Sequence, residues 1–178
     1  MRSVIQLAST LQCACAGWLL ILVCSGCSLE NSDVALRTPP RKDFAAVSSV
    51  FERRCGTLDC HGAPARNLRV YGIFGLRANG LDVTGGAATT DAEVEATYTS
   101  LISIDPETLS RVSADAEAPE QWLVLSKGRA REQHKGGERL PPGSAADACI
   151  LSWLAGHVDE DVCAGDTFSP APLPGEEW

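Results

Sequence analysis

The sequence predicts one mainly α-helical domain with long irregular loops. Three segments between residues 44 and 163 carry apolar residues at helical spacing, and two of them begin with Ser or Thr followed three residues later by an acid. Aromatic residues make up only 6% of the 178-residue chain, and its 16 glycines and 10 prolines favour loops over a dense sandwich or barrel. The length allows one modest domain plus processing segments. A core this small usually needs a covalent or cofactor staple.

Three helices can be placed in order. Asp43 can cap a first helix over residues 44–55, whose apolar positions share one face and end at a cysteine. A capping box at Thr90 opens the second helix, which stops before Pro106. The third helix begins after Ser144. Its predicted buried stripe consists of Ile150, Trp153, Leu154 and His157.

The segments around these helices are less regular. Pro119 suits the first turn of a shorter helix that includes Trp122 and Leu125. Residues 62–89 contain many glycines and short β-like runs, so we expect a long loop that holds at most a small hairpin. Its apolar residues indicate packing on a surface such as a flat apolar cofactor. Residues 164–178, with three prolines, are expected to form a flexible tail.

Residues 1–26 have the features of a secretory signal peptide. Arg2 precedes an uncharged stretch whose apolar centre is too short to cross roughly 30 Å of hydrocarbon, although the whole stretch leaves a permanent anchor as the alternative. The residues before Cys27 resemble the lipobox of bacterial lipoproteins, with Cys24 at a position that is usually aliphatic. The resemblance implies cleavage before Cys27, lipidation of its sulfur and anchoring to the membrane on the periplasmic face of the cell envelope. Residues 27–43 are then expected to form a tether.

The charge balance argues against nucleic acid as a partner. The chain has 23 Asp and Glu against 15 Lys and Arg, which gives a net charge of −8. Proteins that bind phosphate backbones need the opposite balance. Removal of the signal peptide deletes one basic residue, so the mature surface is predicted to be acidic.

The most specific motif is Cys55-Gly-Thr-Leu-Asp-Cys60-His61, in a chain that is predicted to be exported. Covalent haem attachment needs two thiols that form thioethers and an imidazole directly after the second thiol to bind the iron. The usual spacing has two residues between the thiols, whereas four lie between Cys55 and Cys60, and Gly56 eases such a bulge. Alternatives are a small disulfide loop, or a zinc site that would use these three side chains.

The order of segments from Phe44 to Gly156 resembles the class I cytochrome c fold: a helix leading into the haem motif, a long loop, a loop with prolines and a closing helix. Residues 126–142 and 150–156 resemble the C-terminal half of secreted bacterial cytochrome c-like domains. The resemblance implies covalent haem c, electron transfer and redox protein partners. In that family a methionine commonly precedes the proline pair and binds the iron, but Leu140 stands there and the chain's one methionine is Met1.

His134 is the candidate replacement for the missing methionine. It lies six residues before Leu140 in a glycine-containing loop, and would give bis-histidine ligation and a lower potential. The alternatives are a solvated loop histidine, ligation by His157, or an iron left open on one side for small-ligand or peroxide chemistry. Arg66 and Arg69 are candidate partners for the haem propionates.

Cys149 and Cys163 lie at either end of the closing helix, and we expect a disulfide between them. Asp159, Glu160 and Asp161 lack the spacing of a calcium loop and indicate a solvated helix end. The sequence therefore favours a membrane-anchored electron carrier rather than a catalyst. The rival hypothesis is a haem-free lipoprotein that is held together by disulfides and serves binding or envelope structure. In this hypothesis Cys149 and Cys163 form cross-pairs with Cys55 and Cys60.

Overall fold

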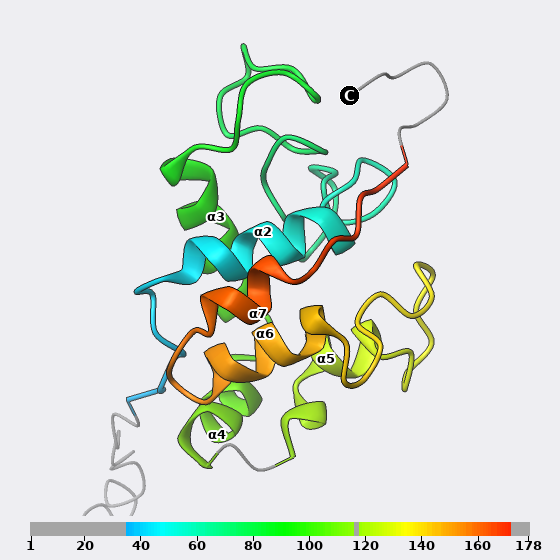
Figure 1. Cartoon of the computed structure of the whole chain (residues 1–178). Coiled ribbons are helices and arrows are strands. Elements are labelled where there is room, and N and C mark those ends of the chain that lie inside the picture. Colours follow the sequence, from blue (N-terminus) through cyan, green and yellow to red (C-terminus); the bar gives the residue numbers. More distant parts are fainter. Residues whose placement is uncertain (1–34, 116–117, 172–178) are drawn as a thin grey trace, which may run out of the picture. The chain divides into compact units, whose positions relative to one another are not determined.

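The computed structural model describes residues 35–115 and 118–171 (Figure 1). The described residues form six α-helices, one 3₁₀ turn and no strand, apart from an isolated bridge between Tyr71 and Leu76. This confirms the mainly α class. The predicted signal peptide, the predicted lipidation site Cys27 and the last seven residues lie outside the described residues. Within the described ranges, no helix has the length and apolar character needed to cross a membrane.

Helix α2, Phe44–Cys55, has the predicted bounds but not the predicted cap. Its buried face contains Phe44, Val47, Val50, Phe51 and Cys55. Asp43 makes no side-chain capping bond and has a left-handed φ of 61°, so its carboxylate does not reach the first turn. At the other end of the helix, Arg53 and Arg54 in the last turn complement the C-terminal dipole.

Helix α3, Asp91–Ile102, begins with the predicted capping box, in which Thr90 and Glu93 satisfy each other's backbone N–H groups. It is followed by α4, Pro106–Asp115, which the sequence analysis missed. The second helix ends before Pro106, as predicted, but Pro106 itself occupies the first position of a new helix, where a missing N–H costs nothing.

The predicted helix at Pro119 is divided in two. A 3₁₀ turn covers Pro119–Gln121, and α5 covers Leu123–Gly128, because Trp122 between them is extended at ψ 125°. Helix α6, Ala145–Leu154, has Ser144 as its predicted cap. The acidic run is the start of a further helix, α7, Glu160–Ala164, which Asp159 caps.

An aromatic cluster forms the centre of the core. Phe44 lies 5.1 Å from both Tyr98 and Trp153, and Trp122 lies 6.1 Å from Trp153, measured between ring centroids. Tyr98 donates to the Pro39 carbonyl and Trp153 Nε1 donates to the Pro40 carbonyl, both at 2.8 Å. The end of the predicted tether therefore packs against the core.

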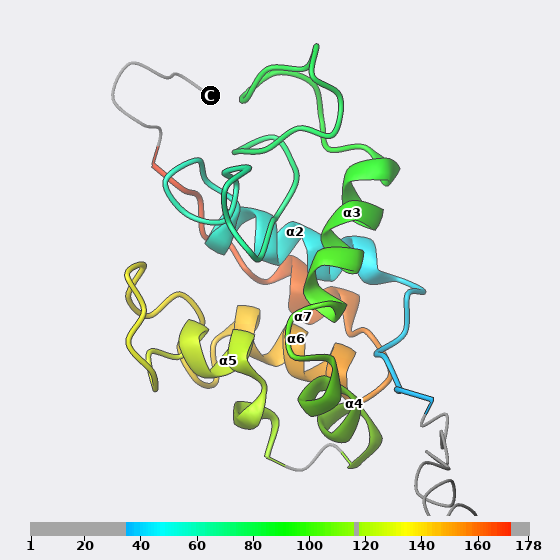
Figure 2. The ribbon, with the colours of Figure 1, turned by 180° about the vertical axis from the view of Figure 1, so that it is seen from behind.

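The C-terminal helices are covalently joined, as predicted. Cys149 of α6 and Cys163 of α7 form a disulfide. Beyond it, Asp166 is buried and accepts hydrogen bonds from Arg53 and Arg54 at the end of α2. The predicted tail thus begins with a segment that fastens α2, and this segment lies along that helix in both views (Figures 1 and 2).

The long segment between α2 and α3 is an ordered loop held from both sides. Glu52, buried in α2, accepts hydrogen bonds from the Ile73 N–H at 2.7 Å and from the Thr89 hydroxyl. Arg77 forms a buried ion pair with Glu93 of α3, with Nε 2.7 Å from Oε1. These bonds give a loop without regular structure a fixed path.

Candidate functional site

The Cys55–His61 motif folds into a compact turn at the C-terminal end of α2. The N–H of His61 donates to the Cys55 carbonyl at 2.9 Å, and the N–H groups of Cys60 and Gly62 both donate to Thr57. Gly56 has an ordinary φ of −87°. Glycine is needed here for space rather than for a left-handed backbone, because a Cβ on Gly56 would lie 2.6 Å from the Glu52 carbonyl oxygen and 3.1 Å from Val70 Cγ1.

The ring of His61 is held with one nitrogen free. Its Nδ1 lies 3.1 Å from the Leu68 carbonyl oxygen, and a carbonyl can only accept, so Nδ1 carries the proton. The lone pair is then on Nε2, as in metal-binding histidines whose other nitrogen is held by a second group. Burial, together with the charges of His134 and Arg66, lowers the pKa of His61, and this keeps the imidazole neutral near pH 7.

His134 is arranged in the same way on a separate loop. Its Nδ1 lies 3.0 Å from the Gly137 carbonyl oxygen, which again leaves Nε2 as the free nitrogen. Gly137 has a left-handed φ of 68° that favours glycine in this turn. The loop closes where the N–H groups of Arg139 and Leu140 both donate to the Gly128 carbonyl, at 2.8 and 2.9 Å.

The structure brings His61 and His134 together although 73 positions separate them in the chain. Their ring centroids lie 6.1 Å apart, and their planes differ by 17°. A metal–imidazole bond is about 2.0–2.1 Å, and the bound nitrogen lies about 1 Å from its ring centre, so two imidazoles on opposite sides of one ion hold their centroids roughly 6 Å apart. The separation of the two ring centroids is thus in the range expected if both imidazoles were to bind one metal ion.

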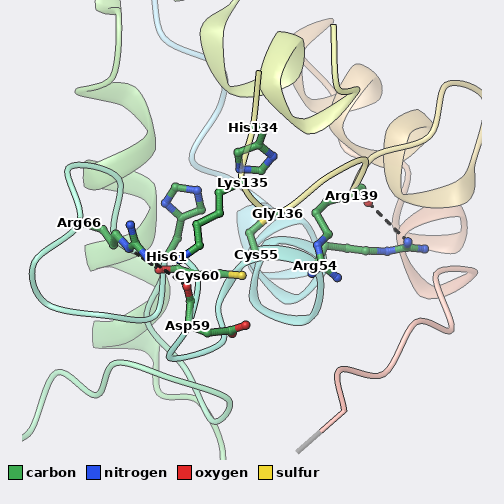
Figure 3. Close-up of a pocket in the computed structure, with 10 residues that line it drawn as sticks. All are labelled: Arg54, Cys55, Asp59, Cys60, His61, Arg66, His134, Lys135, Gly136 and Arg139. Carbon is green, nitrogen blue, oxygen red and sulfur yellow. Dashed lines mark hydrogen bonds between the residues drawn. The ribbon is translucent and has the colours of Figure 1, made fainter. Parts of the chain in front are cut away.

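Two cavities meet at this histidine pair. The smaller, about 210 Å³, is lined by both histidines and by both thiols of the motif. Figure 3 shows His61 and His134 entering it from different loops, with Arg66 on one side and Arg54 and Arg139 on the other.

The larger cavity, about 410 Å³, shares Cys55, His61 and His134 with the smaller one, and its volume is typical of cofactor sites. Its remaining wall is largely apolar and includes Leu68, Ile104, Leu123, Val124 and Leu140. Leu140, at the position that the resemblance assigned to methionine, is 1% exposed and packs against Gly128. Both histidines and both thiols therefore line adjoining cavities, and the larger of the two has a mostly apolar wall.

Among the described cysteines, Cys55 and Cys60 carry free thiols. Burial, with a smaller effect of Cys60, raises the pKa of Cys55 to about 12, against the opposing effect of Arg139 and Arg54. Cys55 is therefore a protonated thiol at neutral pH, and Cys60 lies closer to solvent. The small disulfide loop and the cross-pairs with Cys149 and Cys163 are not formed.

Three other predictions from the sequence are changed by the structure. His157 lies beyond the end of α6 and is exposed, so it does not belong to the buried stripe and cannot reach the site. Arg66 donates to the carbonyls of Cys60 and Asp59, and Arg69 donates to the Arg66 carbonyl. No three His, Cys, Asp or Glu side chains in the described ranges are grouped to hold a metal ion, so the three-ligand zinc hypothesis gains no support.

Several side chains that line the site were not predicted from the sequence. Lys135 and Arg139 line the smaller cavity, and Ile104, Leu123 and Val124 line the larger one. Lys135 directly follows His134, which is a signal that could have indicated it, whereas Arg139 lies five positions after His134 and nothing local marks it. The apolar residues come from α5 and from the connection before α4, and nothing local marks them.

Comparisons with protein-family models, with curated proteins and with solved structures find no significant match to this chain. The functional argument therefore depends on the residues and geometry of the site.

Proposed function

We propose that the chain is a membrane-anchored c-type haem protein with a cytochrome c-like fold, and that it carries single electrons. The observation that supports this proposal best is the opposed pair His61 and His134, each with Nε2 free, beside the free thiols of Cys55 and Cys60. In this proposal Cys55 and Cys60 would hold the haem through thioethers, and His61 and His134 would bind its iron. When bound, haem supplies a one-electron couple between the ferric and ferrous states.

The chain's own residues set the conditions for that couple. Each Nδ1–H···O=C bond fixes the orientation of an imidazole and makes its Nε2 a stronger donor, which favours the ferric state and lowers the potential. The apolar wall of the larger cavity excludes water from the ring. If both imidazoles bound the iron, no position on it would be left for a substrate, and this would favour a carrier over a peroxidase.

The first test is covalent haem retention. The full chain is co-expressed with a haem-attachment system, and haem is detected after denaturing electrophoresis. We expect retention in the wild type and its loss in the double variant Cys55→Ala, Cys60→Ala. A colourless wild-type protein would refute the proposal and leave the disulfide-stapled lipoprotein hypothesis in its place.

The second test concerns His134. His134→Ala is expected to change the oxidised protein from low-spin to high-spin, because one axial ligand is lost. His157→Ala is the matched control, since that histidine is exposed and away from both cavities. The nearly parallel imidazole planes also predict a rhombic low-spin electron paramagnetic resonance signal rather than a single large-g feature. An unchanged spectrum in His134→Ala would remove His134 from the proposal.

The membrane anchor is a separate part of the proposal. We propose that Cys27 is lipidated after cleavage of residues 1–26, on the sequence pattern before it. Labelled palmitate should be incorporated by the wild type and lost in Cys27→Ser. Incorporation that persists in Cys27→Ser would contradict this assignment without affecting the haem site.

A further inference from the structure

The described chain returns to the C-terminal end of α2 after the disulfide. Asp166, three residues beyond Cys163, has a side chain that is 1% exposed and forms ion pairs with Arg53 and Arg54. Its Oδ1 accepts a hydrogen bond from Arg54 Nε at 3.1 Å, and its Oδ2 accepts one from Arg53 Nη2 at 3.3 Å. Burial alone would raise the pKa of Asp166, but the bonds from Arg54 lower it, so the carboxylate is charged at neutral pH.

Every nitrogen of the Arg54 guanidinium has a partner. Nε and Nη2 donate to Asp166, and the centre of the group lies 4.5 Å from the centroid of the Phe168 ring. The remaining nitrogen, Nη1, donates to the Arg139 carbonyl at 3.4 Å, and Figure 3 shows this contact at one side of the smaller cavity. Arg54 thus connects the segment after α7 to the loop that carries His134.

The contact between Arg54 and Arg139 differs from the other hydrogen bonds and ion pairs of residues 132–140, the His134 loop. In the described chain, the others that leave this loop go to α5, at Ser126, Lys127 and Gly128. The bond from Arg54 comes from α2, whose C-terminal end leads into the Cys55–His61 motif. It is therefore the hydrogen bond that ties the loop of one histidine to the helix that leads to the other.

We infer that Asp166 is a positioning residue for His134: it orients Arg54, which holds the carbonyl that closes the His134 loop. This inference rests on the proposed function, in which His134 binds the iron. A guanidinium whose side chain is only 17% exposed needs a partner for its charge. Without the Asp166 carboxylate, Arg54 turns towards solvent and its bond to Arg139 is lost. The loop is then tied to α5 alone, and His134 leaves the iron more often.

A purely structural role for Asp166 leads to a different expectation. Loss of Asp166 would then lower the stability of the whole domain, as would loss of the buried pair formed by Arg77 and Glu93. Glu93 lines neither site cavity, and its side-chain bonds within the described chain go to Arg77, Ala78 and Thr90. Glu93→Ala is therefore the matched control for Asp166→Ala.

The first experiment uses the haem-free full-length protein in neutral detergent, so that it does not depend on haem attachment. Hydrogen–deuterium exchange with mass spectrometry compares the wild type with the two variants. We expect residues 132–140 to exchange about tenfold faster in Asp166→Ala, the factor that corresponds to loss of one hydrogen bond from a charged group. In Glu93→Ala this segment should exchange as in the wild type. Equal rates in all three proteins, or equal acceleration in both variants, would overturn the inference.

The second experiment measures how readily His134 leaves the iron. Cyanide is added to the oxidised, haem-loaded protein, where it displaces one imidazole without a change of oxidation state, and the rate is followed in the visible spectrum. We expect a rate about tenfold higher in Asp166→Ala than in the wild type, because the loop is released more often. Glu93→Ala should react at the wild-type rate. A wild-type rate in Asp166→Ala would overturn the inference.

Asp166→Asn decides the question if Asp166→Ala does not fold. Asparagine keeps the shape of the side chain and one acceptor oxygen but not the charge, so both rates should rise by a smaller factor, about threefold. Wild-type rates in Asp166→Asn would then overturn the inference. Absence of covalent haem would refute the proposed function but leave the exchange experiment intact, whereas haem-loaded protein whose two rates do not depend on Asp166 refutes this inference alone.

Discussion

Replacing Gly62 by alanine should disrupt the junction that holds the motif in place. Gly62 follows His61, and three glycine backbones converge there: the new Cβ would lie 1.9 Å from the Gly56 carbonyl oxygen and 2.9 Å from the Gly75 Cα. Ordinary contacts between carbon atoms are about 3.5–4.0 Å. Because both obstacles are backbone atoms, no side-chain rotation can relieve the overlap.

The cost of this substitution can be worked from that geometry. Overpacking a well-packed site costs about 1–3 kcal/mol, and the upper end applies where backbones must separate by more than about 1 Å. For a compact unit that spans Leu36–Trp178, the entropy of unfolding is about 0.3 kcal/mol per kelvin. A loss of about 3 kcal/mol then lowers Tm by about 10 °C.

The assay is thermal unfolding followed by circular dichroism, together with the visible spectrum of the haem-loaded protein. Gly80→Ala is the matched control, because a Cβ at Gly80 meets nothing within 4 Å. We expect Gly62→Ala to lose both stability and low-spin character, since the movement separates His61 from His134. A Tm within about 2 °C of the wild type would refute the close convergence of these backbones.

Three further predictions concern buried charge and the disulfide. Burial alone would raise the pKa of Glu93, but hydrogen bonds from Arg77 and from backbone N–H groups lower it to about 2. The stability that this carboxylate contributes is thus present above about pH 4.5 and lost as the pH falls towards 2. Chemical denaturation should show that the difference in unfolding free energy between the wild type and Glu93→Gln shrinks by about 3 kcal/mol over that range. Burial raises the pKa of Glu52, so the contribution of this carboxyl to stability declines as the pH rises above about 4.5. The Tm of Glu52→Gln should therefore rise relative to that of the wild type between pH 5 and pH 8. A difference in Tm that stays constant over this range would contradict the prediction. Replacing Cys149 and Cys163 with alanine should cost about 3 kcal/mol in denaturant melts while haem retention is unchanged.

Local chemistry accounts for the helices that the sequence analysis predicted correctly. Thr90 and Ser144 start α3 and α6 because their hydroxyls accept N–H groups of the first turn, which a short sequence pattern reveals. Asp43 satisfies the same composition rule, but it has a left-handed φ of 61°, and the two prolines before it are bonded to the core through their carbonyls. Such tertiary effects leave no local signal.

The residues of the site likewise include some that a local sequence pattern reveals and others that only the fold brings together. Cys55, Cys60 and His61 were identified because the motif is contiguous, and His134 because of its distance from the proline pair. Arg139 and the apolar wall were missed, since their proximity to the motif is created by the packing of α5 and the His134 loop. Nine of the fifteen basic residues lie in the segments 53–69 and 126–140, and the fold brings these two segments to one cavity.

The two candidate ligands are positioned by parts of the structure that do not depend on a cofactor. His61 is fixed by the Gly56–Gly62 junction at the end of α2, and His134 by the bonds at Gly128 at the end of α5. The four aromatic residues at the centre of the core line neither site cavity, although Cys55, Leu68 and Leu140 of the same core do. The Cys149–Cys163 disulfide and the buried Arg77–Glu93 ion pair supply the additional stabilisation that so small a core needs. It follows that a haem-free form should keep its fold and present the two imidazoles at nearly their final separation, so that loss of haem and loss of folding can be measured apart.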